Sequence, residues 1–496
     1  MTRGQGSDSY SSAGHTGRGL VSRMSKIAII GAGFSGSILA VQLLRRLGTD
    51  LGGDSRIDLI DKHGPARGLA YSTTSERHLL NVPAGRMSAF PAEPDHFLNW
   101  LRADTAGGGV PQIKPSSFVP RLVYGRYLED LLAQASRANP GRIKTHRETA
   151  IAVDANADGM RISFAGGKKL DADVVVLAPG NFSPADPPIA DRAFYTSAFY
   201  RRDPWAAGAL DQIEPGAPVL LIGAALTTVD IAISLIERGH TGVIHAISRH
   251  GLLPRRHLDA SATPAIAPFE LDALPNSARA MLRAVRARIA LESTRGIPWQ
   301  SVIDGLRPVT QDLWRRAPAP ERARFVRHLR PWWDVHRHRV APEIAARIDA
   351  AQASGQLVFH AGRIERYRID GSAVEVEYRS RDSAELKSLR VARVINCSGP
   401  SSDYRHIDDP LIQSMLQSGI VRTDPSRLGL EVTGDLRVVA ADGSANRRLF
   451  ALGSITKGAF WEIIAVPDLR AQCEALADRI AREVRQTAQS ARSHLT

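Results

Sequence analysis

The chain has 496 residues, which is too long for one hydrophobic core and predicts two or three domains. Its content of 43% hydrophobic and 23% charged residues is that of a globular protein and excludes disordered and fibrous classes. A formal charge of +13 is compatible with a nucleic-acid partner, but no RNA- or DNA-binding motif accompanies the excess arginines. We therefore expect no nucleic-acid partner and interpret the charge as a basic pocket for anionic cofactors.

Residues 1–24 are rich in Gly, Ser and Arg without an apolar secretory segment, so they predict a disordered tail, with Met1 or Met24 as the start. No apolar run approaches the roughly 18 residues that span a bilayer, which predicts a soluble protein without a membrane partner. The two cysteines, Cys397 and Cys473, form no Cys-x-x-Cys pair. This spacing excludes disulfide-reductase chemistry and fits a reducing cytoplasm.

The first expected elements follow the order strand, glycine-rich turn, helix, strand. Residues 26–30 form an apolar run typical of a strand, and Gly31–Gly36 supply the turn. A helix is expected from about Ser37 to Leu47, and the strand Ile57–Asp61 ends in an acid. This order is the context that a dinucleotide-binding fingerprint requires.

The same order returns later in the chain. Pro218–Gly223 predicts a strand, Ala224–Asp230 opens a helix, and Gly242–Ser248 predicts the next strand. The other expected elements are two β runs within 149–164, a buried strand at 173–180, a mostly helical insertion near 260–350, β pairs at 363–369 and 373–379, and strands at 393–399 and 448–453, followed by a helix over about 468–487.

These elements predict an α/β protein with two Rossmann-like dinucleotide-binding domains, β-meander crossovers and a helical insertion in the second domain. The expected parts are the tail at 1–24, a first FAD-binding part at 25–205, an NADP-binding domain at 206–390 and a second FAD-binding part at 391–496. In this scheme the last strand and the terminal helix return to the first domain, so the FAD-binding domain is discontinuous.

The first glycine motif has the chemistry of a pyrophosphate site. Gly31 permits the sharp turn, Gly33 lets the backbone approach phosphate, and Gly36 lets the helix pack closely on the strand. Asp61 can accept hydrogen bonds from ribose hydroxyls, which suits FAD or NAD and disfavours a 2′-phosphate.

The second copy departs from this pattern. Ala225 adds a methyl group where the backbone should approach phosphate, and Thr228 enlarges the contact between helix and strand. A nucleotide site and a purely structural turn are therefore both open. The next strand ends in Ser248, Arg249 and His250 in place of an acid, with Arg255 and Arg256 nearby. Such residues favour the 2′-phosphate of NADPH, although a solvated basic loop is the alternative.

Five segments resemble the FAD/NAD(P)-binding family that includes the FAD-dependent urate hydroxylase and the aspartate N-monooxygenase. They are Gly68–Thr73, His78–Pro91, Val119–Leu128, Ile247–Pro254 and Gly453–Asp468. The resemblance implies that Asp61, Lys62, Asn81 and the turn around Gly453 line FAD, and that Gly223–Asp230 faces the nicotinamide nucleotide. The family usually has glycine where this chain has Ala225.

The candidate FAD contacts are Gly31, Ala32, Gly33, Phe34, Ser35, Gly36, Asp61, Lys62, Asn81, Val82, Gly180, Gly399 and Gly453. The candidate NADPH contacts are Gly223, Ala225, Leu226, Thr227, Ser248, Arg249 and Arg255. Around Asn81, the fixed proline backbone suits a flavin wall, with an ordinary ordered loop as the alternative.

Arg86, Lys457 and Trp461 are candidates for the substrate pocket, although Trp461 also fits a plain core aromatic. His336 and His338 suggest a metal, but a His-x-His pair suits a strand, whereas this stretch is helical and has no cysteine or clear carboxylate set. We expect no metal there and interpret the stretch as a basic helix start near the domain junction.

The leading hypothesis is an FAD-dependent, NADPH-using monooxygenase. It would use O₂ to hydroxylate a small nitrogen- or carbon-containing substrate through a C4a-hydroperoxyflavin. The catalytic residues and the oligomeric state are unknown at this point. Two alternatives are open: an NAD(P)H-linked flavin reductase or oxidase, and a nucleotide-binding regulator without turnover.

Overall fold

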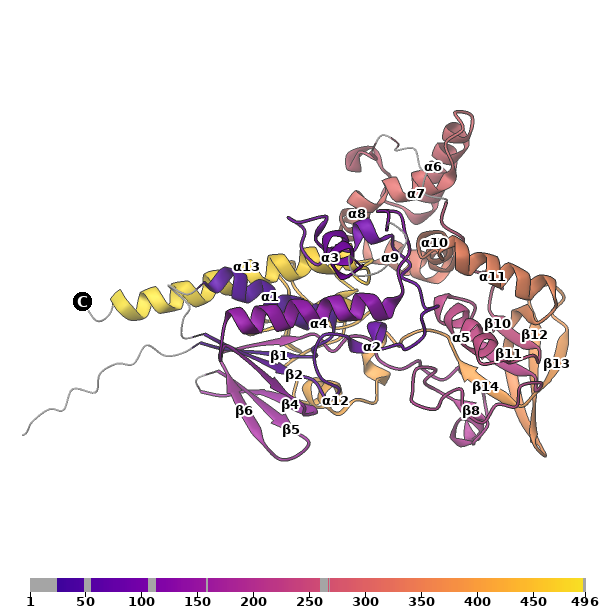
Figure 1. Cartoon of the computed structure of the whole chain (residues 1–496), viewed down its shortest axis with the longest axis horizontal. Coiled ribbons are helices and arrows are strands. Elements are labelled where there is room, and N and C mark those ends of the chain that lie inside the picture. Colours follow the sequence, from indigo (N-terminus) through magenta and orange to yellow (C-terminus); the bar gives the residue numbers. More distant parts are fainter. Residues whose placement is uncertain are drawn as a thin grey trace, which may run out of the picture.

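The computed structural model describes residues 25–48, 55–105, 113–157, 159–258, 266 and 268–493. The predicted tail at 1–24 lies outside the described residues, as does 259–265 near the start of the insertion. Two units built on β-sheets lie side by side, with the long last helix beside the first unit and the helical insertion above their junction (Figure 1). Among the described helices, none has the length and apolar character needed to cross a membrane.

The first sheet is built around β1 (Lys26–Ile30), which lies between β2 (Arg56–Ile60) and β7 (Val174–Leu177), all parallel. These strands are nearly continuous apolar runs because helices and a second sheet cover both of their faces. β16 (Ala445–Ala451) pairs in parallel with β7, so the last strand lies in the first sheet. The outer strands are β3 (Ile143–His146) and β15 (Arg437–Val439), in the order β15-β16-β7-β1-β2-β3.

Helix α1 (Phe34–Leu47) is buried along most of its length because it is packed between the sheet, α4 (Arg121–Ala138) and α13 (Val466–Ser493), and its basic residues lie in the last turn. A separate antiparallel sheet joins β4 (Ala150–Ala155), β5 (Met160–Phe164) and β6 (Lys169–Ala172). The other helices of this unit are α2 (Gly68–Tyr71), α3 (His96–Thr105) and α12 (Pro410–Gln417), with a short 3-10 turn η1 at Ala84–Arg86.

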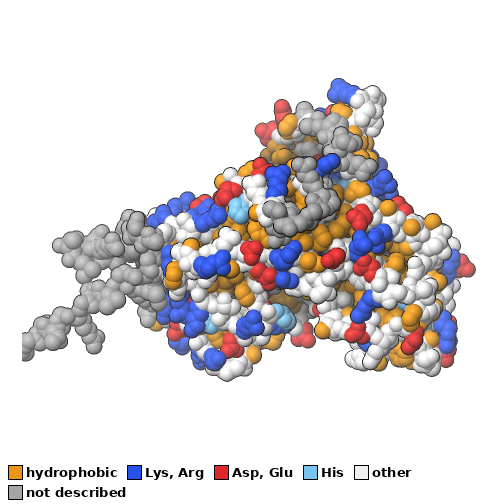
Figure 2. All heavy atoms as spheres, in the orientation of Figure 1, with side chains coloured by type: hydrophobic (Ala, Val, Ile, Leu, Met, Phe, Trp, Pro, Cys, Tyr) orange, Lys and Arg blue, Asp and Glu red, His pale blue; other side chains and the backbone are white. Residues whose placement is uncertain are grey.

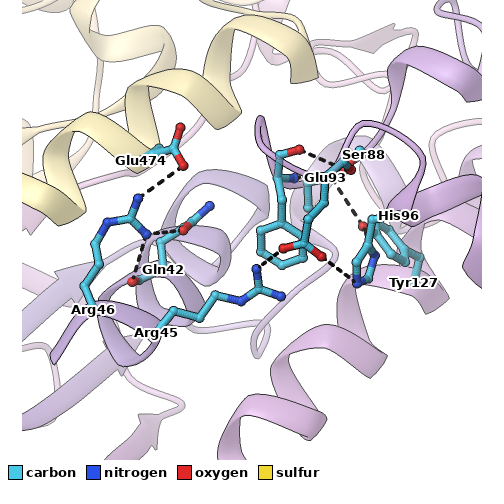
Figure 3. A network of polar contacts seen from close by, with 10 residues as sticks. Gln42, Arg45, Arg46, Ser88, Glu93, His96, Tyr127 and Glu474 are labelled. Carbon is cyan, nitrogen blue, oxygen red and sulfur yellow. Dashed lines mark hydrogen bonds and ion pairs between the residues drawn. The ribbon is translucent and has the colours of Figure 1, made fainter. Parts of the chain in front are cut away.

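A polar network holds the loop after η1 against α1 (Figure 3). Arg45 of α1 forms an ion pair with Glu93, and Glu93 lies 4.0 Å from the His96 ring. His96 Nδ1 is 2.9 Å from the hydroxyl of Tyr127 on α4. Helices α1, α3 and α4 are thereby tied to the segment that follows residues 81–86.

The second sheet repeats the arrangement around β9 (Val219–Ile222), which lies between β10 (Ile244–Ser248) and β14 (Arg393–Asn396), all parallel. The other strands are β8 (Tyr200–Arg201), β11 (Leu357–Asp370), β12 (Ala373–Ser380) and β13 (Leu386–Val391), in the order β13-β12-β11-β10-β9-β14-β8. Helices α5 (Leu226–Glu237) and α11 (Pro342–Ala353) pack on one apolar face of this sheet. The predicted α/β class with two Rossmann-like units is confirmed.

The domain boundaries predicted at 205 and 390 are wrong, because they assign two strands of the second sheet to the FAD-binding parts. β14 lies inside the predicted second FAD-binding part, yet Val394 pairs with Leu220 of β9 in the second sheet. β8 lies inside the predicted first part and pairs with β14. The physical reason is that β9 needs a parallel neighbour on its open side, and residues 393–396 supply it as β7 does for β1. The chain returns to the first sheet only at β15 and β16.

The insertion leaves the second sheet after β10 and returns before β11. Its two ends meet at a β-bridge between Arg256 and Val340. The helices between are α6 (Ala278–Ser293), α7 (Trp299–Gly305), α8 (Thr310–Arg316), α9 (Ala319–Arg324) and α10 (Arg330–Arg337), with a π-helical turn at Phe325–Leu329. A small apolar core around Val302 holds these helices together.

The two units are joined by polar contacts at the start of α5. Arg121 forms an ion pair with Asp230 at 2.8 Å, and both side chains are largely buried. His78 Nε2 lies 2.8 Å from the Ser234 hydroxyl. These contacts fix the second unit relative to the first at the helix that carries the second glycine motif.

Candidate functional site

The first glycine turn has the close packing that the fingerprint predicts. Gly31 has a φ of +96°, and a Cβ there would lie 2.0 Å from the carbonyl oxygen of Ala178. A Cβ on Gly36 would lie 1.9 Å from the Gly31 carbonyl oxygen. Neither position accepts a side chain without moving β1, β7 or α1. A Cβ on Gly33 would come within 3.3 Å of the Gly68 Cα and would not clash with a backbone oxygen. Packing therefore does not require glycine at position 33, and the predicted requirement comes instead from the approach of a phosphate.

The start of α1 offers free hydrogen-bond donors. Gly33 caps the helix without a side-chain hydrogen bond, so the backbone N–H groups of its first turn have no partner within the helix. Asp61 accepts hydrogen bonds from the backbone N–H groups of Ala32 at 2.9 Å and His63 at 2.9 Å. The carboxylate therefore shapes the turn and keeps lone pairs for a further donor. Lys62 beside it is exposed.

Other predicted FAD contacts surround this turn. Gly453 follows β16, and a Cβ on it would lie 3.0 Å from the Ser35 hydroxyl. Gly180 follows β7, and its carbonyl accepts a hydrogen bond from Ser454 at 2.9 Å. The structure thus brings Phe34, Ser35, Gly180 and Gly453 to one edge of the first sheet. A cradle that a Cβ would fill, with free N–H groups at a helix start, fits a dinucleotide pyrophosphate.

Gly399 is placed differently from its prediction as an FAD contact. It follows β14, the strand of the second sheet whose end lies against the second glycine turn. Cys397 precedes Gly399 by two residues, and a Cβ on Gly223 would lie 2.5 Å from the Cys397 carbonyl oxygen. Gly399 therefore corresponds in the second unit to Gly180 in the first.

The second turn keeps only part of the pattern. Gly223 has a φ of +122°, and Ala225 caps α5 without a side-chain hydrogen bond. Thr228 is fully buried, and its hydroxyl has no hydrogen-bond partner among the described residues. Leu226 and Thr227 form the first turn of α5, where unpaired N–H groups remain available for a phosphate.

The end of β10 carries a basic group that includes one residue the sequence analysis missed. The Ser248 hydroxyl accepts a hydrogen bond from the Gly251 N–H at 3.0 Å, so it closes a turn. Arg249 is exposed. Arg381, in the turn between β12 and β13, contacts the His250 ring and donates to the Arg249 carbonyl at 3.3 Å. No local sequence signal links residue 381 to β10, because only the pairing of β11 with β10 and β12 brings it there.

Arg255 is exposed, but its main chain belongs to the base of the insertion. Its N–H donates to the Val335 carbonyl at 2.9 Å, and its carbonyl accepts from the Val340 N–H at 3.0 Å. The predicted NADPH contacts therefore form three groups: one at the second glycine turn, one at the end of β10 and one at the base of the insertion.

A cavity of about 500 Å³ lies where the first unit, α5, the insertion and the loop before α13 meet. Predicted residues of three kinds reach it: Asn81 and Val82 from the flavin wall, Arg86 from the substrate set, and Leu226 from the second turn. The insertion and the loop before α13 supply further wall residues, namely His257, Asp304, Arg307, Arg337, His338, Arg339, Glu462 and Ile464. On the face drawn in Figure 2, hydrophobic side chains gather near the centre, while charges of both signs are spread over the rest.

The charges of the cavity wall are mostly paired. Arg339 forms an ion pair with Asp304, and this guanidinium holds the Asp304 pKa below its ordinary value although burial alone would raise it. Burial lowers the Arg307 pKa, in spite of an ion pair with Asp468 at 2.7 Å. Arg86 is exposed and has no ion-pair or hydrogen-bond partner for its side chain among the described residues. It is available to an anionic group in the cavity.

Two neutral imidazoles share this wall. Burial, aided by the Arg339 charge, lowers the pKa of His257 to about 4, and its Nε2 lies 3.0 Å from the Asn81 carbonyl oxygen. Burial also lowers the pKa of His338, whose Nε2 lies 3.2 Å from Glu462 Oε1. His336 faces a different partner, the Trp332 carbonyl at 2.7 Å, so the two histidines of the His-x-His pair do not converge.

Trp461 does not line the cavity, contrary to the substrate-lining prediction. It is 3% exposed and stacks on Trp314 of α8 with ring centroids 4.8 Å apart. Lys457 Nζ lies 4.9 Å from the centre of the Trp461 ring, and burial lowers the Lys457 pKa to about 8. Trp461 belongs to an aromatic cluster that joins the insertion to the loop before α13. Lys457 packs on this cluster and, like Trp461, is not among the residues that line the cavity.

Neither cysteine is suited to redox chemistry. Cys397 and Cys473 are fully buried and unpaired, and burial raises the pKa of both thiols. One follows β14 in the second unit, and the other lies on α13 in the first.

Two parallel glycine-turn units that meet at one cavity define the fold of flavoproteins with two dinucleotide-binding domains. Residues 28–182 match the protein family described as FAD-NAD(P)-binding, and these residues carry the whole first turn. The comparison with curated proteins finds no match.

Solved structures share the fold over nearly the whole chain. The ornithine N-hydroxylase of Kutzneria sp. 744, described with reduced FAD, NADP⁺ and L-ornithine, is 12% identical with a TM-score of 0.60, covering 92% of this chain and 99% of that one. The FAD-bound cadaverine monooxygenase of Erwinia amylovora is 14% identical with a TM-score of 0.60, covering 92% and 94%. The thioredoxin reductase of Lactococcus lactis is 10% identical with a TM-score of 0.52, covering 93% and 99%.

Proposed function

We propose that this chain is an FAD-dependent, NADPH-using monooxygenase that hydroxylates the nitrogen of a small primary amine. The observation that carries the proposal is the cavity at the junction, because residues of the first unit, of the second glycine turn and of the insertion all line it. A small molecule held there can meet both nucleotides. The structurally similar ornithine hydroxylase and cadaverine monooxygenase support this choice of chemistry.

Two residue sets of the chain would hold the cofactors. FAD fits the turn at Gly31–Gly36 with Asp61, and the wall at Asn81 and Val82 suits its ring. NADPH fits the start of α5 with Arg249 and Arg381. When bound, the flavin would take a hydride from NADPH and activate O₂, and the protein contributes binding, orientation and protection from water.

The buried thiols argue against disulfide reduction, but not against a flavin reductase, which needs no thiol. Thioredoxin reductase has the same fold, but dithiol chemistry needs two accessible cysteines close together. Cys397 and Cys473 are fully buried in different units. Buried free thiols also suit a cytoplasmic location, which we include in the proposal.

Arg86 supports a substrate that carries a carboxylate beside its amine. Its guanidinium lines the cavity without a partner among the described residues, whereas Arg307, Arg337 and Arg339 are each paired with a carboxylate. A guanidinium can hold a carboxylate through two parallel hydrogen bonds. An amino acid would therefore lie with its acid group towards η1.

NADPH is expected to be preferred over NADH because of Arg249 and Arg381. Removing one charge-assisted contact to a 2′-phosphate costs about 1.5–3 kcal/mol, roughly ten- to a hundred-fold in affinity. Arg249→Ala and Arg381→Ala should each raise KM for NADPH by that factor and leave KM for NADH nearly unchanged. Arg255→Ala serves as the comparison variant. The main chain of Arg255 is bonded to the insertion rather than to the end of β10, so its loss should change KM for NADPH less. Equal losses with both nucleotides would show that these arginines are structural.

The proposed function is tested by the balance of NADPH, O₂ and products. The purified protein should reduce its flavin with NADPH, and with its substrate it should form one hydroxylated product per NADPH consumed. An oxidase would release one peroxide per NADPH whatever amine is offered. A reductase would pass electrons to an added acceptor, and a regulator would leave the flavin oxidised. Each of these three results contradicts the proposal.

A further inference from the structure

A carboxylate and an imidazole form a pair on the cavity wall. Glu462 lies in the loop before α13, and His338 is the residue directly after α10. Glu462 Oε1 and His338 Nε2 are 3.2 Å apart, and both residues line the cavity. Sequence spacing alone does not reveal this pair, because the two positions are 124 residues apart in the chain.

The insertion holds Glu462 in an unusual conformation. Its φ is +70°, a left-handed backbone conformation that is strained for a residue other than glycine. The side chain is fixed by α10: Trp333 Nε1–H donates to Oε1 at 2.7 Å, and Arg337 forms an ion pair with Oε2 at 2.8 Å. Such local strain persists where surrounding contacts determine the position, and it is concentrated at functional sites.

The pair fixes the tautomer of His338. Glu462 is an acceptor for Nε2–H, so the neutral ring carries its proton on Nε2 and its lone pair on Nδ1. Nδ1 has no hydrogen-bond partner among the described residues. Burial lowers the pKa of His338, so the ring is neutral at physiological pH.

We propose that His338, oriented by Glu462, is the base that removes a proton from the substrate ammonium before its nitrogen is hydroxylated. The inference rests on the proposed function and adds a catalytic residue to it. An ammonium group has no lone pair, so its nitrogen cannot attack an oxygen electrophile until it loses a proton. An amine with a pKa of about 10 is only about 0.3% free base at pH 7.5.

The proton transfer balances within the whole reaction. One N–H bond of the ammonium breaks, its electron pair stays on nitrogen, and a new N–H bond forms at Nδ1 of His338. Overall, an ammonium, NADPH and O₂ give a hydroxylamine, NADP⁺ and water. The proton that His338 takes is one of those that end in the water, so no further proton is consumed.

Four charged groups act on His338. They are Glu462 and Asp334, which favour a protonated ring, and Arg337 and Lys457, which oppose it. Arg86, Asp304, Arg307 and Arg339 share the cavity wall with His257. His257 is the weaker candidate, since its ring contacts a backbone carbonyl rather than a carboxylate and the Arg339 charge opposes its protonation. Asp304 is paired with Arg339 and is not a free acceptor.

The test is the pH dependence of hydroxylation in wild type and His338→Gln. Glutamine keeps a donor for Glu462 and removes the Nδ1 lone pair. L-Ornithine, L-lysine, cadaverine and L-aspartate are offered, and the hydroxylamine product is measured by mass spectrometry. At pH 7.5 the variant should be slower by about 10²–10⁴-fold. Its rate should then recover about tenfold per pH unit up to the pKa of the amine, while the wild-type rate stays flat over the same range.

Two comparisons separate the base from a structural role. Flavin reduction by NADPH needs no substrate base, so its rate should be the same in His338→Gln and wild type. Glu462→Gln, which alters the positioning residue, should lower hydroxylation less than His338→Gln and shift its pH profile. His360→Gln is the matched control: His360 is a partly buried imidazole on β11 with a pKa of about 4, outside the cavity.

Failure of the inference differs from failure of the proposed function. If wild type hydroxylates an amine and His338→Gln does so equally at pH 7.5, the inference is wrong and the function stands. A loss that high pH does not restore also overturns the inference. If wild type hydroxylates none of the four amines, the proposed function fails and the inference with it. Should the variant not fold, ¹³C NMR of the wild-type histidines decides: a doubly protonated His338 at pH 7.5 excludes it as a base.

Discussion

Gly33→Val is expected to purify as folded but colourless protein. The valine Cβ would lie 3.3 Å from the Gly68 Cα, so α2 must shift by only a few tenths of an ångström. Crowding of this size costs about 1–3 kcal/mol, which a domain of this size tolerates. The side chain would occupy the space in front of the α1 donors, where the pyrophosphate belongs. Flavin absorbance per protein after gel filtration measures the loss.

Gly36→Val is the matched comparison and should behave differently. Its Cβ would lie 1.9 Å from the Gly31 carbonyl oxygen, which forces α1 away from β1 in the middle of the core. We expect a loss of about 4 kcal/mol or more, seen as insoluble or unfolded protein by circular dichroism. If Gly33→Val kept its full complement of FAD, the assignment of the first turn would be wrong.

Arg121→Met is expected to lower the free energy of unfolding by about 2–3 kcal/mol. The change removes the partner of Asp230 and leaves a carboxylate that is only 8% exposed without its counter-charge. Because Asp230 lies on α5, the second glycine turn should lose its fixed position relative to the first unit. The measurements are a urea titration and the rate of flavin reduction by NADPH.

Asp230→Asn is the companion variant for the same ion pair. A double-mutant cycle with Arg121→Met isolates the coupling between the two side chains. We expect a coupling of about 1–3 kcal/mol and a parallel slowing of flavin reduction in both single variants. Additive effects would show that the pair contributes little to the junction. Normal flavin reduction in both variants would show that the junction does not position the second turn.

The first unit was predictable because its signals are local. The strand, the three glycines and Asp61 lie within 36 residues, and Gly31 and Gly36 are required by contacts between neighbouring elements. The second unit was recognisable by repetition of the same order. The boundaries of the second unit could not be predicted, because β14 pairs with β9 across more than 170 residues and a sequence pattern does not show which sheet a strand joins.

The cavity was only partly predictable. Arg86 lies on its wall, whereas Trp461 is core, because an aromatic residue after a strand suits a pocket and a packing cluster equally well. Arg381 and the pair of His338 with Glu462 could not be found from spacing. Each depends on a tertiary contact between elements that are distant in the chain, and neither carries a local motif.

Because Arg256 and Val340 are bridged, the two ends of the insertion lie next to each other, and the segment between them can be treated as one replaceable unit. Its two ends meet at one point beside the second sheet, so the segment between them could be replaced without changing the chain path of either nucleotide unit. That segment supplies His257, Asp304, Arg307, Arg337, His338 and Arg339 to the cavity. Substrate choice could therefore diverge among proteins of this architecture by change within one contiguous stretch, while both cofactor sites remain under separate selection. An engineer could likewise graft a foreign insertion at these two residues.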